Sequence, residues 1–592
     1  MRETDLRHLI EDVREGRLAR RSFIERMVLA GLSVPMAAQV LLHAGVAQAQ
    51  PTVNYKPTKR GGGGPLRLLW WQGATLLNPH FATGTKDAEA ARIFYEPLAT
   101  FDSEGTLLPV LAAEIPSRAN GGVSADGKTV TWKLKRGVTW HDGQPFTADD
   151  VVFNWEYARD PATASVTAGI YKDIKVQKVD LHTVRVVYPN PSPFWGLFPT
   201  QLQIPKHLFA AYSGAKSRDA PANLKPVGTG PYKFVEFKPG DMVRGQINMN
   251  YHMPNRPHFD TIEMKGGGDA ASAARAVMQT GEYDLAWNLQ VEDEVLKRME
   301  DGGKGRVHLV HAGDIEFILV NHTDPWTEVE GERASIKSRH FAFSEHTVRQ
   351  AMSLLVDRKS IQDFIYGRTG TATSNFINAP ARFRSANTRY EFNVEKASQV
   401  LDAAGWKKGA DGLREKGGHK MKFVFQTSVN PIRQKCQAIV KQACQKAGID
   451  VELKSVTASV FFSSDLANPD TNSKFWSDIT MFTTSMGPPD PERLADRFTS
   501  WEVASKANKW QGRNIGRWHS PDYDKLFRAA EAEMDPVKRA ALFIAMNDMV
   551  VKEVGVIPLI QRPRVLGVNN KLVVSPGWGV DLGTIQDWYR ES

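Results

Sequence analysis

The hydrophobic pattern of the chain predicts both strands and helices. Apolar and polar residues alternate over Val130–Leu134 and Val184–Tyr188, which is the period of a half-buried strand. The spacing changes after Ser344, which is expected to cap a helix that carries Val348 and Leu355 on one face. Strands dominate from about 100 to 220, and strands alternate with helices from 311 to about 550. The pattern therefore predicts a layered α/β fold.

Cap residues predict where further helices begin. Thr147 and Asp150 form a capping box ahead of an apolar run. The pair Asn430-Pro431 is predicted to begin a helix that ends at Gly448, because proline suits the first turn and glycine the residue after the last. A strand is expected to follow over Asp450–Val456.

One segment matches a nucleotide-binding pattern by its letters alone. Gly122–Thr129 reads G-x-x-x-x-G-K-T, but a phosphate loop needs a buried strand before it and a helix after it. Here an alternating strand follows, and Asp126-Gly127 is typical of a turn. We therefore predict a turn and no nucleotide binding.

Length and composition narrow the class of protein. A chain of 592 residues, 42% of them hydrophobic, exceeds the size of one core and predicts at least two lobes. The 75 basic and 66 acidic residues give a net charge of +9 and are interspersed, which argues against nucleic-acid binding. The two cysteines, Cys436 and Cys444, exclude a disulfide scaffold, a four-thiolate zinc site and an iron–sulfur cluster.

Short signals for catalysis or metal binding are missing. Neither G-x-S-x-G nor H-E-x-x-H occurs. His308 and His311 are three residues apart and would point to opposite faces of a strand. Carboxylates are too numerous for a catalytic pair to be chosen by spacing. We expect no enzyme activity, no cofactor and no metal site.

Residues 1–49 are predicted to be a signal peptide. Arg20-Arg21 precede the apolar run Met27–Ala47, and Ala47-Gln48-Ala49 supplies a cleavage site. The paired arginines favour twin-arginine export. A membrane anchor is the alternative, because the run is about as long as a bilayer span, although Gly31 and Pro35 dilute its hydrophobicity. No cysteine lies near the cleavage site, so we expect a soluble, non-lipidated protein in the periplasm.

Two neighbouring segments resemble a known family. They are Asp126–Leu134 and Trp140-His141-Asp142-Gly143-Gln144-Pro145-Phe146-Thr147-Ala148-Asp149-Asp150-Val151. Shorter matches follow in the same order as in the family, at Tyr95–Leu98, Gly228–Tyr232, Val348–Ala351, Ala403–Trp406 and Pro521–Asp524. The chain is similar to the extracellular solute-binding proteins of family 5, the peptide- and nickel-type binding subunits of bacterial ABC importers.

The resemblance implies a two-lobed periplasmic binding protein fold of type II. This fold has an extra β-rich domain, and a hinge of two strands joins its lobes. Lobe I is then expected to be discontinuous, built from 50–100, 221–310 and 555–592. The extra domain is expected over 101–220, and lobe II over 311–554.

A cleft that closes on a solute needs aromatic walls and a few fixed polar groups. The candidates are two residues near the first predicted strand, Trp71 and Asn78, two that follow Tyr283-Asp284, Trp287 and Asn288, and a later group of Thr483, Thr484, Ser485, Met486, Asp490 and Arg493. Relatives that bind peptides carry an aspartate, three residues before an acidic residue–proline pair, that accepts the peptide's amino terminus. Gly487 stands at that position here. Asp490 either substitutes for it or caps a helix over Pro491–Arg497.

The resemblance thus implies a periplasmic substrate-binding protein that captures a small polar solute and delivers it to an ABC permease. Peptides or peptide-like compounds are the default solutes of the family, and we expect a monomer. The alternatives are an exported hydrolase, or a binding protein for a non-peptide solute such as an opine, an oligosaccharide or a metallophore.

Overall fold

The chain folds into two compact units in a computed structural model. The model describes residues 3–14, 18, 22–23, 26–27, 55–82, 84–103, 105–192, 195–462, 467–508, 510 and 512–591. Arg20, Arg21 and the expected cleavage site at 47–49 lie outside the described residues. Within the described part of the chain, no helix is long and apolar enough to cross a membrane.

The chain passes between the two units four times. Unit 1 comprises 1–289, 298–310 and 565–592, and unit 2 comprises 290–297 and 311–564. Two of the crossings join successive strands: β11 (Gly305–Val310) leads into β12 (Ile315–Val320), and β22 (Ile557–Gln561) leads into β23 (Arg564–Asn569). The strand-rich block at 101–220 groups with unit 1.

Unit 1 is built on a mixed seven-stranded sheet. Its order is β11-β23-β10-β1-β9-β8-β7, and β1 is parallel to both β9 and β10. The remaining strands of this sheet are β1 (Pro65–Leu69), β7 (Tyr232–Lys238), β8 (Met242–Ile247), β9 (Thr261–Lys265) and β10 (Leu285–Ala286). Its helices are α1 (Glu3–Arg14), α4 (Thr85–Ala91), α5 (Ala148–Arg159), α6 (Ala168–Tyr171), α7 (Lys206–Phe209) and α8 (Ala270–Met278), and α9 (Asp293–Glu300) spans the boundary at 297/298.

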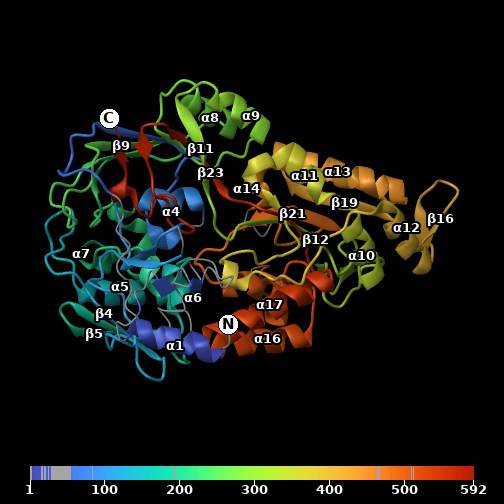
Figure 1. The fold of residues 1–592 in the computed structure, drawn as a ribbon, viewed down its shortest axis with the longest axis horizontal. Coiled ribbons are helices and arrows are strands. Elements are labelled where there is room, and N and C mark those ends of the chain that lie inside the picture. The colour runs from blue at the N-terminus through green and yellow to red at the C-terminus, as the bar shows by residue number, and fades with distance from the viewer. Residues whose placement is uncertain are drawn as a thin grey trace. The chain divides into compact units, whose positions relative to one another are not determined.

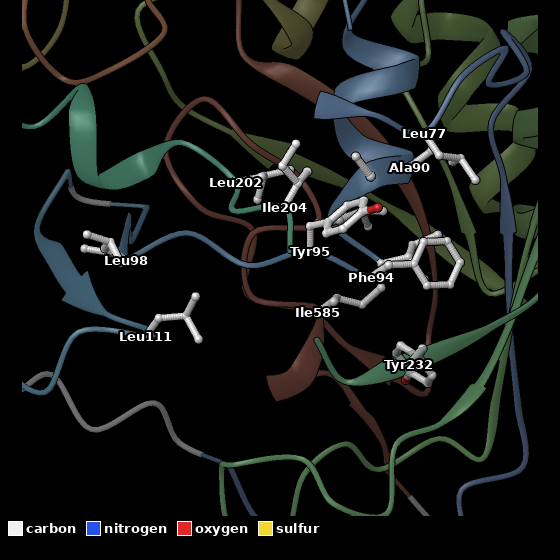
Figure 2. Close-up of a cluster of buried hydrophobic side chains, with 14 of the residues drawn as sticks. Leu77, Ala90, Phe94, Tyr95, Leu98, Leu111, Leu202, Ile204, Tyr232 and Ile585 are labelled. Atoms are coloured by element: carbon white, nitrogen blue, oxygen red, sulfur yellow. The ribbon is translucent and has the colours of Figure 1, made fainter. Parts of the chain in front are cut away.

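The strand-rich block adds smaller sheets to unit 1. They consist of β2 (Ala99–Phe101) with β3 (Leu107–Pro109), and β4 (Thr129–Lys133) with β6 (Thr183–Val187) and β5 (Lys175–Asp180). Near the C-terminus, β24 (Leu572–Val573) pairs with β25 (Tyr589–Arg590). One hydrophobic cluster unites segments far apart in the sequence, including Leu77, Phe94, Leu202, Tyr232 and Ile585 (Figure 2). The block and the main sheet therefore share a core.

Unit 2 is built on a six-stranded sheet in the order β15-β22-β12-β21-β19-β20. Strand β19 is parallel to β20 and β21, and β12 is antiparallel to β21. The strands not yet given are β13 (Glu328–Val329), β14 (Glu332–Arg333), β15 (Thr371–Ala372), β16 (Lys407–Lys408), β17 (Arg414–Lys416), β18 (His419–Lys420), β19 (Lys422–Ser428), β20 (Asp450–Val456) and β21 (Ile479–Thr484). The helices are α10 (His346–Leu354), α11 (Arg358–Ile361), α12 (Val394–Ala403), α13 (Pro431–Ala447), α14 (Ala458–Phe461), α15 (Glu492–Ala495), α16 (Pro521–Ala532) and α17 (Pro536–Lys552).

Alternate residues of β12 pack against different groups of buried side chains in unit 2. Ile318 and Val320 pack in the cluster that contains residues of α10, α12 and α13. Phe317 instead contacts Phe376, which contacts Phe498, and these residues lead toward α16. Within unit 2, Figure 1 shows α13 on one side of β19 and β21 and the α16–α17 pair on the other. A strand buried on both faces explains why β12 reads as one apolar run.

Most predicted element starts are confirmed, and one is wrong. Thr147 caps α5 with a capping box, and Asn430 caps α13 by accepting the N–H of Arg433. The turn at Asp126 is followed by β4, so the phosphate-loop pattern has no helix after it. Ser344 does not cap α10, which begins at His346. The Ser344 N–H instead donates to the carbonyl of His340, which makes it part of the preceding turn.

Candidate functional site

In each unit, candidate residues lie where parallel strands end. In unit 1, β1 ends at Leu69 and the adjacent β10 at Ala286, so Trp71 and Trp287 follow at the same edge. In unit 2, β19 ends at Ser428 and the parallel β21 at Thr484. The carboxyl edge of parallel strands is the usual place for ligands in open α/β sheets.

Three tryptophans form the edge of unit 1. Trp70 stacks on Trp287 with ring centroids 5.3 Å apart and planes 7° from parallel. Trp71 lies 6.2 Å from Trp287, and its Nε1–H donates to the Trp287 carbonyl at 2.9 Å and to that of Asn288 at 3.3 Å. Trp70 and Trp287 are buried, whereas Trp71 and Asn288 are half-buried. This edge therefore offers an aromatic surface with few free polar groups.

Two buried carboxylates hold the segment behind Trp287. The Trp287 Nε1–H donates to Asp581 at 3.0 Å. Glu89 accepts the backbone N–H groups of Asp581 and Leu582 at 3.0 and 2.8 Å. Burial, together with the nearby Asp581 charge, raises the pKa of Glu89 above its ordinary value. These contacts fix the orientation of the Trp287 ring.

Asn78, the fourth candidate of unit 1, is buried. Its side-chain oxygen accepts the N–H of His80 at 2.9 Å, and its amide group donates to Asn223 at 2.7 Å. The contact with His80 caps a single 3₁₀ turn over Pro79–Phe81. Both ends of the Asn78 amide are therefore engaged within unit 1.

The candidate residues of unit 2 differ in exposure. Ser485 is exposed, Thr483 is half-buried, and Thr484 and Met486 are buried. Met486 packs so closely on Gly313 that a Cβ at position 313 would lie 2.4 Å from the Met486 Cβ. Met486 thus ties the segment after β21 to the one before β12, and Ser485 and Thr483 keep access to solvent.

A buried ion pair that the sequence analysis missed holds Thr483. Arg433, in the first turn of α13, donates to Glu316 of β12 at 2.7 Å and to the Thr483 hydroxyl at 2.9 Å. The Thr483 hydroxyl also donates to Glu316. Burial opposes the charge of Arg433, but the Glu316 carboxylate outweighs it and raises the pKa of the guanidinium. A glutamate within the apolar strand Ile315–Val320 was the available signal.

Asp490 is buried against Arg539. Both carboxylate oxygens accept from the Arg539 guanidinium, and Oδ1 also accepts the N–H of Glu492 at 3.1 Å, in the first turn of α15. Gly487 is exposed, and a Cβ there would meet nothing within 4 Å. Arg493 is exposed and pairs with Asp496 at 3.0 Å. The carboxylate of Asp490 is therefore neutralised within unit 2.

The two edges suit stacking and hydrogen bonding. Unit 1 presents indole surface, and unit 2 presents hydroxyls and backbone groups beside a fixed ion pair. Among the described residues, no three His, Cys, Asp or Glu side chains are grouped to hold a metal ion. Both cysteines are free and buried in α13, and burial raises the pKa of each thiol, so neither is a ready nucleophile.

Comparisons with known proteins agree with this architecture. The oligopeptide-binding protein AppA of Bacillus subtilis is 26% identical over 443 residues, covering 73% of this chain and 76% of AppA. The glutathione-binding protein GsiB of Escherichia coli is 24% identical over 497 residues, covering 82% and 86%.

Solved structures show the same fold. AppA of B. subtilis in complex with a nonapeptide matches with a TM-score of 0.73 and 23% identity, covering 91% of this chain and 100% of that one. NikZ of Campylobacter jejuni in complex with Ni(L-His) also matches with a TM-score of 0.73 and 23% identity, covering 89% and 99%. Residues 106–505, more than half of the chain, match the family model of bacterial extracellular solute-binding proteins, family 5. The chain belongs to this family.

Proposed function

We propose that the protein captures a small polar solute between two closing lobes and delivers it to the permease of an ABC importer, without catalysis. The observation that carries the proposal is that each unit ends its parallel strands in a candidate contact surface: half-buried Trp71 in unit 1, and Thr483 with Ser485 in unit 2. Relatives described as peptide-binding and glutathione-binding proteins support a transport role.

The proposed lobe boundaries coincide with a chain crossing at 310/311 and differ from the crossing near the C-terminus. Lobe I takes 50–100, 221–310 and 555–592, the extra domain takes 101–220, and lobe II takes 311–554. The crossing at 310/311 supports the boundary between β11 and β12. The crossing near the C-terminus lies at 564/565, at the start of β23 and ten residues after the proposed boundary at 554/555, because β22 pairs with β12 of unit 2.

We propose a peptide or peptide-like solute whose amino group is not held by the segment after β21. The default follows from AppA, which was solved with a nonapeptide. Gly487 offers no carboxylate, and Asp490 is neutralised by Arg539. A buried ammonium without a counter-charge costs several kcal/mol, so an amine needs another anchor. A nickel–amino acid complex is the second candidate, because NikZ was solved with Ni(L-His).

The solute is best identified directly. Protein purified from its native compartment is denatured, and the released small molecules are analysed by mass spectrometry. A peptide or another polar compound released in molar proportion supports the proposal. Calorimetry with that compound then gives its affinity. A released compound that the protein converts during incubation would instead favour an exported hydrolase.

Two tryptophan variants test the location of the site. Trp71→Leu removes indole surface from the unit 1 edge and is expected to weaken solute binding at least tenfold. Trp501→Leu is the matched control, because Trp501 is 41% exposed and packs on Arg528 of α16 in unit 2. Equal binding by Trp71→Leu and the unchanged protein would contradict this site.

We also propose export to the periplasm as a monomer through the twin-arginine route. Arg20 and Arg21 would be the recognised pair. Replacing both with lysine is expected to retain the protein in the cytoplasm, as cell fractionation would show. An unchanged periplasmic yield would remove the twin-arginine assignment and leave general secretion as the route.

A further inference from the structure

A cavity lies in unit 1, and Trp70, Trp71 and Trp287 are not among the residues that line it. It has a volume of about 480 Å³, within the range of about 300–1,000 Å³ that is typical of small-molecule pockets. It lies where β4 ends, beside the turn between β5 and β6 and the loop after β8. Buried Leu134 and Val138 contribute apolar lining.

The lining of this cavity is basic. Five of its nine residues are basic and none is acidic: Lys133, Lys135, Arg136, His182 and His252. Acidic neighbours compensate only in part. Glu114 pairs with Lys133 at 2.9 Å on the exposed side, and Asp180 acts electrostatically on Arg136. Like charges in a concave site repel one another strongly, so a bound anion would lower the energy of this arrangement.

Lys135 and His252 have polar groups that the protein does not satisfy. Among the described residues, none makes a hydrogen bond or ion pair with the Lys135 ammonium. Burial lowers its pKa, and the Glu96 charge opposes this shift. The His252 side chain is 6% exposed. Its Nε2 faces the Glu96 carboxylate at 3.0 Å, while its Nδ1 is buried without a hydrogen-bond partner.

Glu96, the carboxylate that contacts His252, accepts hydrogen bonds from two further side chains. Glu96 accepts from Thr229 at 2.8 Å and from the Tyr251 hydroxyl at 2.7 Å, in addition to His252. Burial opposes the charge of Glu96, but His252 and these hydroxyls hold its pKa below the ordinary value. With Nε2 engaged by Glu96, Nδ1 is the His252 ring nitrogen that no described residue contacts by a hydrogen bond.

We propose that this basic cavity is a second binding site, for a small anion that carries a phosphate group. A guanidinium matches two phosphate oxygens, and an ammonium acts as a point charge on them. Arg136 and Lys135 supply these groups in the lining of the cavity. The phosphate belongs either to a free small molecule or to a lipid headgroup.

Calorimetry with pyrophosphate and with inorganic phosphate, at constant ionic strength, tests the site. The unchanged protein is expected to bind pyrophosphate saturably. Lys135→Gln and Arg136→Gln should each weaken binding at least tenfold, and Arg136 is exposed, so its replacement is compatible with folding. Lys216→Gln is the matched control, an exposed lysine of the same unit outside the cavity. Thermal unfolding without phosphate verifies that each variant is folded.

Vesicle flotation separates the two sources of phosphate. Capture by phosphatidylglycerol vesicles but not by phosphatidylcholine vesicles, lost in Arg136→Gln and competed by pyrophosphate, identifies a lipid headgroup. Pyrophosphate binding without capture identifies a free phosphate compound. The proposal is overturned if neither probe binds, or if Lys216→Gln weakens binding as much as the cavity variants.

Discussion

The side chains at the carboxyl ends of the parallel strands differ between the two units. Unit 1 places an indole stack there, with Trp287 fixed from behind by Asp581. Unit 2 places a buried ion pair, Glu316 with Arg433, that holds the hydroxyl of Thr483. The edge of unit 1 is therefore an apolar aromatic surface, and the edge of unit 2 holds polar side chains in fixed positions.

The side chains at the two edges are held in place by different interactions, ring stacking in unit 1 and a buried ion pair in unit 2. Stacked rings are stabilised by burial of apolar area and by ring geometry, worth about 0.5–1.5 kcal/mol per pair beyond area, and loss of one ring contact leaves no unpaired charge. A buried ion pair is stable only while both partners are present, because one left alone is an uncompensated charge. We therefore expect unit 2 to be more sensitive to single substitutions at its edge.

Arg433→Met should give the largest effect. It leaves Glu316 buried without its partner and is expected to lower the free energy of unfolding by about 3–5 kcal/mol. Urea unfolding, followed by hydrogen exchange of the α13 amides, measures the loss in unit 2. The double variant Glu316→Gln with Arg433→Met should recover most of it, since no charge is then left alone. A double variant as unstable as the single one would contradict the ion-pair explanation.

The second-largest expected effect is a loss of unfolding free energy at low pH, caused by a buried histidine in the core of unit 1. Burial lowers the pKa of His80 from 6.5 to about 4, although a hydrogen bond with Asn154 at 2.9 Å opposes the shift. The unfolded chain binds a proton at this histidine between pH 6.5 and 4 and the folded protein does not. The stabilisation is therefore complete above pH 6.5 and falls as the pH falls toward 4, by about 3 kcal/mol.

Hydrogen exchange of the α5 amides at pH 7 and pH 4.5 tests this, because Asn154 lies in α5. His80→Gln should reduce the pH dependence, whatever it does to stability at pH 7. His141 and His322 also have lowered pKa values, of about 4 and about 3, because of burial. They remain in the variant together with His258 and His308, whose pKa values burial also lowers, and these groups contribute to the slope that persists. An unchanged slope in His80→Gln would exclude His80 as the source.

The sequence predicted local features of this comparison better than distant ones. The helix start at Asn430 follows from a cap and a proline that adjoin in the chain. The role of Arg433 depends on Glu316, 117 residues away, and Asp490 is held by Arg539, 49 residues away. No periodic pattern contains such pairs. Glu316 stands out in the sequence as a glutamate within the apolar, fully buried strand β12, but the sequence does not indicate its partner.

Trp287→Phe should give a smaller effect in unit 1. It keeps an aromatic ring against Trp70 but removes the donor to Asp581, a buried carboxylate. The expected loss of unfolding free energy is about 1–3 kcal/mol. Trp71→Phe is the matched control, because the Trp71 indole donates only to backbone carbonyls and is half-buried. If the two variants are equally unstable, the contact with Asp581 does not decide the stability of this edge.

Gly487→Asp should have the smallest effect on stability and a clear one on binding. The position is exposed, a Cβ there meets nothing within 4 Å, and its backbone is not in the left-handed region. The free energy of unfolding should therefore change by less than about 0.5 kcal/mol. The Asp490 carboxylate is already paired with Arg539, whereas a carboxylate at position 487 would stand on an exposed residue with open space around its Cβ. A ligand ammonium within reach would gain a charge-assisted hydrogen bond worth about 1.5–3 kcal/mol, or about 10- to 100-fold in affinity.

Calorimetry with di- and tripeptides on Gly487→Asp, and on Gly487→Asn as the uncharged control, measures the gain. A gain in both variants would assign it to hydrogen bonding without charge, and a gain in neither would place the solute's amino group away from this segment of unit 2.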